Sequence, residues 1–291
     1  MTELKKPKTF EEQIEILKSR GLIINNDESA KFILKNVNYY RFTAYLITFK
    51  NEDDTYIEGT TFEMISSIYK FDRELRNLIT DILGNIEISF RTYIAYTLAI
   101  KHGTSGYLNK NNFKNEEYHR GFLLNIQKEK LNNANKLFIK HHNDKYEGIL
   151  PIWVATEIMT FGMLSKLYAN LIPEDQGYIK NNLCSVNPTL LDTWLQSLTH
   201  IRNLCAHYGR IYNTSLPVIK IKKDDKKYRL NDKSIFAYIL IMKYLVADDK
   251  VWNRFFISLQ SLIVEYSSYI ELRLIGFPEN WIEILSKNNR R

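Results

Sequence analysis

Apolar residues recur at intervals of three and four along most of this chain, the spacing that places them on one face of an α-helix. Residues that break helices are scarce, since the 291 residues include six prolines and eleven glycines. The pattern therefore predicts an all-α fold. We expect a single helical domain over residues 1–291, because we find no internal repeat, no low-complexity tract and no clear linker.

Several helix boundaries carry start and stop signals. Thr9 and Glu12 form a capping-box pattern before the amphipathic segment FEEQIEILKSR, and Gly21 marks its expected end. Thr60 and Glu63 form a similar pattern before a proline-free stretch that is either one helix or two helices that break near Gly84. Further helices are expected near residues 28–36, 39–50, 116–146, 152–171, 188–213, 232–247 and 249–267, with a last short one from Pro278, and loops at 51–59 and 103–115.

Two segments differ from this helical pattern. Residues 216–230, LPVIKIKKDDKKYRL, alternate apolar and basic positions and predict a small β-hairpin, although the turn lacks glycine. Residues 235–246, IFAYILIMKYLV, form the longest apolar stretch and contain Lys243. This stretch is too short to span a bilayer, so it predicts a buried helix and no membrane insertion.

Composition adds information about partners and location. The net charge of +7 and the pI near 9.1 favour phosphate-bearing partners, although many proteins of this charge bind no nucleic acid. The two cysteines, Cys184 and Cys205, lack CxxC spacing, which argues against a zinc site or a disulfide framework. The charged N-terminal segment does not resemble a signal peptide, so we expect a cytoplasmic protein.

The segment IRNLCAHYGRIYN, residues 201–213, gathers polar residues in an apolar neighbourhood. On an ideal helix, Gln196, His200, Asn203 and Arg210 fall within about 60° of His207 and form a polar stripe. The opposite, apolar stripe consists of Leu191, Trp194, Leu198, Ile201, Cys205, Tyr208 and Tyr212.

Arg202 does not fit this division, because it lies about 140° from His207, inside the apolar arc. A guanidinium in that position must extend to the rim or meet a carboxylate, since burying it unpaired is prohibitively costly. Histidine can transfer a proton near neutral pH, and arginine can neutralise a phosphate. RNA supplies its own nucleophile, the 2′-hydroxyl, so this pair suffices for metal-free RNA cleavage. A solvated or structural stripe is the competing interpretation.

The order Arg202-Asn203-x-x-x-His207 resembles the Arg-x4-His signature of the HEPN superfamily of helical nucleases and nucleotide-binding domains. The wider chain resembles the abortive-infection proteins of the AbiD/AbiF type, bacterial defence proteins against phage, over roughly residues 7–265. The blocks that carry this resemblance are FEEQIEILKSRGLIINN, NVNYYRFTAYLITF, YKFDRELRNLITDILGNIEISFRTYIAY, TFGMLSKLYANL and LTHIRNLCAHYGRIYN.

The resemblance implies a HEPN-type helical bundle with additional helices at both ends. The core would be residues 60–213, after an N-terminal helical extension (1–59) and before a basic hairpin or loop with C-terminal helices (214–291). It implies a homodimer whose two Arg-x4-His helices form a composite RNase site. It also implies that the reaction uses no cofactor. Arg202 and His207 would be catalytic and Asn203 supporting. RNA would be the substrate, and a small noncoding RNA would be a further partner.

Other residues are expected to support this site. Glu87 and Arg91 lie four residues apart and can pair on one helix face, and Glu87 is a candidate partner for Arg202. A local surface pair is the alternative, and Arg210 is a further supporting candidate. Basic residues after the motif form a candidate RNA-binding segment, with solvated loop charge as the alternative: Lys220, Lys222, Lys223, Lys226, Lys227 and Arg229. A metal site at His141 and His142 is not expected, since adjacent helical residues point about 100° apart.

Two functions of a different class remain open. The groove between the two Arg-x4-His helices could hold a structured RNA or a nucleotide without cutting it, or the chain could be a toxin scaffold for an active partner. The presence of both Arg202 and His207 favours the enzyme.

Overall fold

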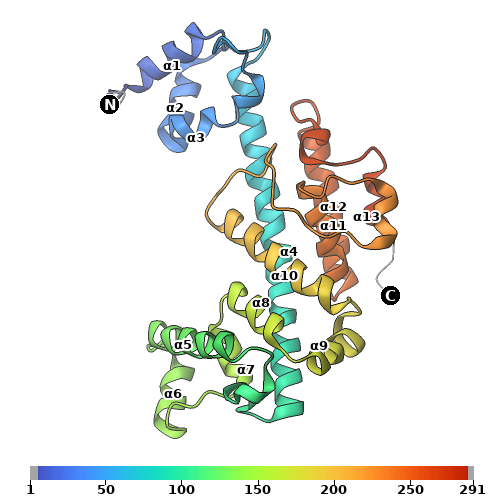
Figure 1. Cartoon of the computed structure of the whole chain (residues 1–291). Coiled ribbons are helices and arrows are strands. Elements are labelled where there is room, and N and C mark those ends of the chain that lie inside the picture. Colours follow the sequence, from blue (N-terminus) through green and yellow to red (C-terminus); the bar gives the residue numbers. More distant parts are fainter. Residues whose placement is uncertain (1–5, 288–291) are drawn as a thin grey trace. The chain divides into compact units, whose positions relative to one another are not determined.

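The computed structural model describes residues 6–287, and these consist of helices and loops with no β-strand (Figure 1). The prediction of an all-α fold is confirmed. The α-helices are α1 Phe10–Ser19, α2 Asp27–Val37, α3 Tyr39–Thr43, α4 Phe62–His102, α5 Glu116–Asn132, α6 Leu137–Lys145, α7 Ile152–Ala155, α8 Phe161–Asn170, α9 Pro173–Ile179, α10 Pro188–Ala206, α11 Ile235–Leu245, α12 Asp249–Glu265 and α13 Trp281–Ser286. Short 3-10 turns at Ile47–Phe49, Gly106–Leu108, Lys110–Asn112, Thr156–Ile158, Lys223–Tyr228 and Leu272–Ile275, and a π-helical turn at Lys180–Cys184, complete the helical structure.

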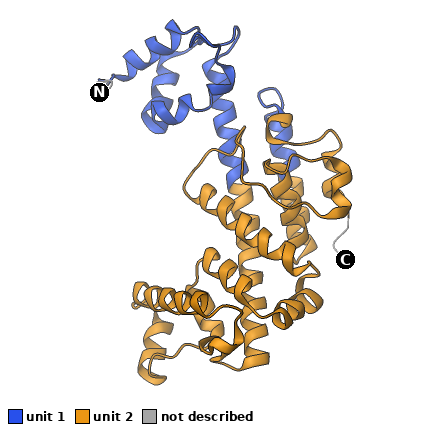
Figure 2. Cartoon of the chain, in the orientation of Figure 1, with its two compact units in different colours: residues 1–76, 259–271 blue, residues 77–258, 272–291 orange. Residues whose placement is uncertain are grey.

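The chain forms two compact units (Figure 2). The first comprises residues 1–76 and 259–271, and the second comprises residues 77–258 and 272–291. The division in the N-terminal half falls inside α4, between Arg76 and Asn77. All of the residues proposed for the Arg-x4-His site belong to the second unit.

The first helix begins and ends where the sequence predicts. The Thr9 hydroxyl accepts from the Glu12 N–H at 3.2 Å, and the Glu12 carboxylate accepts from the Thr9 N–H at 2.7 Å, so the capping box is complete. Gly21 takes a φ of +89°, and the N–H of Leu22 donates to the carbonyl of Leu17 at 3.1 Å. These features form the glycine-containing C-terminal motif that satisfies the last carbonyls of a helix.

A buried polar cluster lies in the core of the first unit. The guanidinium of Arg76 contacts the carboxylate of Asp72, and the side chains of these residues are only 4% and 0% exposed. The hydroxyl of Tyr45 donates to the same carboxylate at 2.5 Å. Burial, followed by the negative charge of Asp72, raises the pKa of Tyr45, so this hydroxyl stays protonated and continues to donate.

Helix α4 continues without a break past Gly84, which settles the choice between one helix and two. The predicted cap at its start is one residue off. The hydroxyl of Thr61 accepts from the N–H of Met64 at 3.1 Å, whereas the hydroxyl of Thr60 donates to the carbonyl of Ile57.

Several predicted helices are shorter than expected. The stretch predicted at 116–146 is two helices, α5 and α6, because the chain turns between them, where the Lys136 N–H donates to the carbonyl of Asn133 at 2.9 Å. The stretch predicted at 152–171 is interrupted before α8, since the Thr160 hydroxyl accepts from the Met163 N–H and starts a new helix. The helix predicted near 39–50 ends at Thr43, and α9 was not predicted.

The β-hairpin predicted at residues 216–230 is wrong. Leu216 and Ile219 donate their N–H groups to the carbonyls of Lys233 and Asp232 at 2.8 and 2.9 Å, so the backbone pairs outside the predicted hairpin. A 3-10 turn at Lys223–Tyr228 occupies the expected turn region.

Helix α11 confirms the prediction of a buried apolar helix, since all of its residues except Tyr244 are buried. Its Lys243 ammonium donates to the carbonyl of Ile284 at 2.7 Å, which provides a polar partner inside the core. Within residues 6–287, no helix combines the length and the apolar character needed to cross a membrane.

Candidate functional site

Helix α10 carries the Arg-x4-His motif and packs against α8 (Figure 1). It begins at Pro188, as predicted, with the side chain of Asn187 accepting from the Thr189 N–H at 3.0 Å. The predicted apolar stripe is buried at six positions, namely Leu191, Trp194, Leu198, Ile201, Cys205 and Tyr212. Tyr208 was predicted to join them but is exposed.

The C-terminus of α10 explains this error. The helix was predicted to continue to Asn213 but ends at Ala206, with His207 as the capping residue. Tyr208 takes the left-handed conformation (φ 58°), and the N–H of Gly209 donates to the carbonyl of Leu204 at 2.8 Å. A side chain at Gly209 would meet Leu204, so the close approach favours glycine there.

The left-handed backbone at Tyr208 leads to a stability prediction. We expect Tyr208→Gly to be more stable than Tyr208→Ala by about 1 kcal/mol, because only glycine adopts this conformation without a steric penalty. The alanine variant is the matched control, since both changes remove the same phenol ring. Urea unfolding measures the difference, and equal midpoints would contradict the strain at this position.

Arg202 reaches the rim of the second unit and meets a carboxylate. Its Nε lies 3.8 Å from Oε2 of Glu87, and its side chain is 42% exposed while that of Glu87 is 13% exposed. Its Nη1 also donates to Oδ1 of the exposed Asn203 at 3.3 Å. The structure therefore places Arg202 as the sequence suggested for a guanidinium in the apolar arc, and with the partner expected there.

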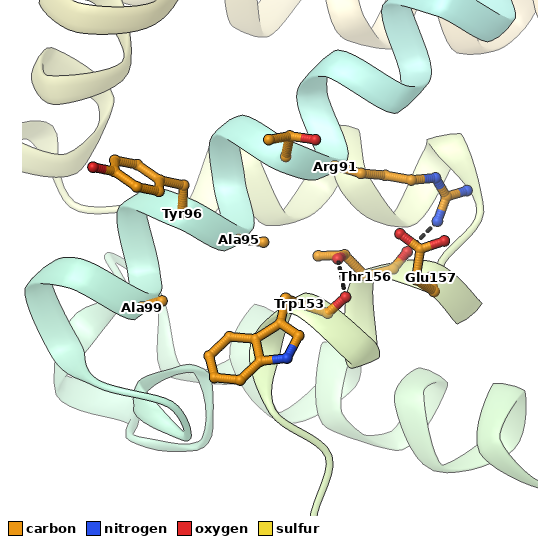
Figure 3. Close-up of a pocket in the computed structure, with 8 residues that line it drawn as sticks. Arg91, Ala95, Tyr96, Ala99, Trp153, Thr156 and Glu157 are labelled. Atoms are coloured by element: carbon orange, nitrogen blue, oxygen red, sulfur yellow. Dashed lines mark hydrogen bonds between the residues drawn. The ribbon is translucent and has the colours of Figure 1, made fainter. Parts of the chain in front are cut away.

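Glu87 is held in turn by Arg91, one turn further along α4. Nη2 of Arg91 donates to Oε1 of Glu87 at 2.5 Å and to the carbonyl of Met159 at 2.6 Å. Its Nη1 donates to the carbonyl of Thr156 (Figure 3). We call Arg91, Glu87 and Arg202 the arginine–glutamate relay. Its contacts with two backbone carbonyls were not predictable, because they depend on where the turn between α7 and α8 lies.

This relay has a clear chemical consequence. One carboxylate oxygen of Glu87 contacts Arg91 and the other lies near Arg202, so both arginines compensate its negative charge. Arg202 keeps part of its guanidinium at the surface, where it can reach an anion. His207 is exposed at the end of the same helix, five residues along the chain. Arg202 thus offers a cation for a phosphate. His207, which lies about 140° from Arg202 on an ideal helix, offers an imidazole for proton transfer.

Arg210 and the basic segment lie beyond the end of α10. Arg210 was assigned to the polar stripe of a continuous helix, but it follows the helix end and is partly exposed. Three of the predicted RNA-binding residues, Lys220, Lys226 and Arg229, line a surface hollow of about 650 Å³. The remaining three basic residues differ: Lys222 lies 3.9 Å from the centre of the Tyr244 ring, Lys227 lies 5.1 Å from that of Tyr228, and Lys223 is exposed.

His141 and His142 contact each other and Tyr146 rather than further metal-ligating groups, with ring centres 5.3 to 5.7 Å apart. Among residues 6–287, no group of three or more His, Cys, Asp or Glu side chains is arranged to hold a metal ion.

A second hollow, of about 280 Å³, adjoins the relay and was not predicted (Figure 3). Arg91 lines it from α4, together with two exposed aromatic residues, Tyr96 on α4 and Trp153 on α7. The only feature of the sequence that could have indicated this hollow is the pair of large aromatic residues, Tyr96 and Trp153, which are not needed in the helical core.

Comparison with known proteins identifies the family. The family model described as "Abi-like protein" matches residues 32–213, which is more than half of the chain, so the chain belongs to this family of abortive-infection proteins. The match includes the relay, Asn203 and His207, and it ends before the basic segment. No curated protein and no solved structure shows a significant match.

Proposed function

We propose that this chain is an endoribonuclease of phage defence, of the AbiD/AbiF type within the HEPN superfamily, which cuts RNA without a metal ion. The observation that carries the proposal is the placement of Arg202. A guanidinium lies at the surface 3.8 Å from a carboxylate that a second arginine holds in place, on the helix that ends at an exposed histidine. Donors and charges aimed at the position where negative charge develops are the usual means by which a protein stabilises such a transition state.

The proposed reaction is a transesterification. The 2′-hydroxyl of the RNA attacks the adjacent phosphorus and loses its proton to a base, and the bond from phosphorus to the 5′-oxygen breaks as that oxygen gains a proton. The products are a 2′,3′-cyclic phosphate and a 5′-hydroxyl. Arg202 would neutralise the extra charge on the crowded phosphate, and His207 would act as the proton donor or acceptor.

A complete site requires two copies of the chain in this proposal. One histidine cannot both accept and donate a proton in the same step, and each chain carries a single Arg-x4-His motif. A homodimer in which two α10 helices face each other would bring two histidines and two arginines to one phosphate. The exposed side chains of Asn203 and His207 are available for that contact. A noncoding RNA is a proposed regulator of the assembled site.

A cleavage assay tests the proposal. Labelled single-stranded RNA is incubated with the purified full-length protein in EDTA or in Mg²⁺, and its length is followed with time. We expect equal cleavage in both conditions. Binding without cleavage in either condition would instead support a non-catalytic RNA-binding module, and cleavage only in Mg²⁺ would refute the metal-independent mechanism.

The hollow lined by Lys220, Lys226 and Arg229 leads to a prediction about RNA binding. We expect replacement of Lys220, Lys226 and Arg229 with alanine to weaken RNA binding at low salt. The slope of log affinity against log salt concentration should fall by about 2, since each phosphate contact to a single strand contributes about 0.7. Alanine at the exposed Lys128, Lys136 and Lys140 is the control with the same change of charge. An equal loss of slope in both variants would show that the hollow has no special role.

A further inference from the structure

The aromatic residues that line the hollow beside the relay are suited to bind a flat ring. Trp153 and Tyr96 are 51% and 49% exposed, although large aromatic side chains gain most by being buried (Figure 3). The volume of about 280 Å³ is at the low end of pockets that hold small molecules, so it suits one ring rather than a longer ligand.

The floor of the hollow exists because α4 presents short side chains there. Ala95 and Ala99 lie one turn apart between the positions of Tyr96 and Trp153 and leave the space open (Figure 3). Arg91, a further turn towards the N-terminus of α4, closes one end of the hollow.

The charges of the hollow exclude a phosphate as its ligand. Arg91 is the only cation among the described residues that line it, and both terminal nitrogens of Arg91 already donate to Glu87 and to two backbone carbonyls. The exposed Glu157 adds a negative charge at the same end (Figure 3). A neutral ligand that can stack and donate hydrogen bonds fits these walls better than an anion.

We propose that this hollow binds an unpaired guanine base of RNA. Guanine has two adjacent donors, N1–H and N2–H, on its Watson–Crick edge, and a carboxylate can accept from both. Adenine and cytosine place a ring acceptor beside their amino group, and uracil has a single ring N–H between two carbonyl oxygens. Stacking on Trp153 and Tyr96 supplies affinity for any base, and Glu157 supplies the preference for guanine.

The position of the hollow connects base recognition to the proposed cleavage. Arg91 lines the hollow and also holds Glu87, which contacts Arg202. A strand whose guanine occupies the hollow would therefore have its backbone near the relay, so the preference of the enzyme for cleavage near guanine would follow. This inference deepens the proposed RNase function and rests on it.

Tryptophan fluorescence gives a test that does not depend on cleavage. Trp153 is the one exposed tryptophan of the four in the chain, since Trp194, Trp252 and Trp281 are 0%, 4% and 7% exposed. We expect GMP to quench its emission by stacking, and UMP to bind about tenfold more weakly. Equal quenching by GMP and UMP, or no quenching by either, would overturn the assignment to guanine.

Variants of the residues that line the hollow test the role of each one. Affinities for labelled UUGUU and UUUUU are measured by anisotropy in the His207→Ala background, so that the RNA remains intact. We expect Trp153→Ala and Tyr96→Ala each to weaken the binding of UUGUU about tenfold, and Glu157→Gln to reduce the preference for UUGUU over UUUUU about tenfold. The exposed Tyr118→Ala and Glu117→Gln on α5 are the matched controls and should change neither value.

Failure of this inference is distinguishable from failure of the proposed function. If the wild type cuts RNA without preference for guanine and Trp153→Ala cuts equally well, the guanine site is refuted and the proposed nuclease function is retained. If GMP binds as expected but RNA is never cut, the nuclease is refuted, and the hollow stands as a nucleotide-recognition site. Variants of Trp153 that bind no more weakly than the controls overturn the site in either case.

Discussion

Arg202→Ala and His207→Ala each lower the rate of RNA cleavage by a factor on the order of 10²–10⁴ in our account. The arginine variant loses the charge that stabilises the crowded phosphate, and the histidine variant loses the group that transfers the proton. Because the two residues serve one reaction, the double variant should be hardly slower than either single variant. Single-turnover cleavage of a labelled RNA measures the three rates.

Matched controls separate catalysis from general effects on the fold. His141→Ala removes an exposed histidine from α6, and Arg120→Ala removes an exposed arginine from α5, so both variants should cut at the wild-type rate. Arg202→Lys should recover little activity, because lysine lacks the planar fork that engages a phosphate through two hydrogen bonds. Cleavage at the wild-type rate by Arg202→Ala would refute its role.

Asp72→Ala destabilises the first unit by about 3–5 kcal/mol in our account, because it leaves the buried guanidinium of Arg76 without its carboxylate. The hydroxyl of Tyr45 loses its acceptor in the same variant, which adds to the cost. Urea unfolding followed by circular dichroism measures the loss of stability.

A triple variant isolates the cause of this loss. Tyr45→Phe, Asp72→Leu and Arg76→Met together remove the whole polar cluster and replace it with apolar groups. This variant should recover most of the stability that Asp72→Ala loses, since replacing a buried ion pair by apolar groups is often nearly neutral. If the triple variant is as unstable as Asp72→Ala, the loss reflects a cavity rather than the lost ion pair between Asp72 and Arg76.

The hydrophobic periodicity predicted the class of fold and most of the helices. The buried helix α11 followed directly from it, and the helical character of α4 did too, although one helix or two remained open there. The starts of α1 at Thr9 and of α10 at Asn187–Pro188 were recognisable because they depend on neighbouring residues. The errors at helix boundaries occurred where a local hydrogen bond or a backbone conformation starts or ends a helix. At Thr160 a hydroxyl starts α8, and at Tyr208 a left-handed residue without glycine ends α10.

The candidate site was predictable to the extent that one helix carries it. The angular position of Arg202 indicated that it must extend to the rim or meet a carboxylate, and it is 42% exposed with Glu87 3.8 Å away. The hydrogen bonds from Arg91 to the carbonyls of Thr156 and Met159 were not predictable, since they join segments far apart in the sequence. The place of Trp153 at the hollow was not predictable for the same reason, because residues of α4 far from it in the sequence line the hollow with it.

The chemical nature of the RNA ends produced in EDTA distinguishes a metal-independent transesterification from hydrolysis. We expect the wild-type protein to yield fragments with a 2′,3′-cyclic phosphate and a 5′-hydroxyl, and His207→Ala to yield none above the buffer control. Fragments with a 5′-phosphate, or the same cyclic ends from His207→Ala at the wild-type rate, would contradict this expectation.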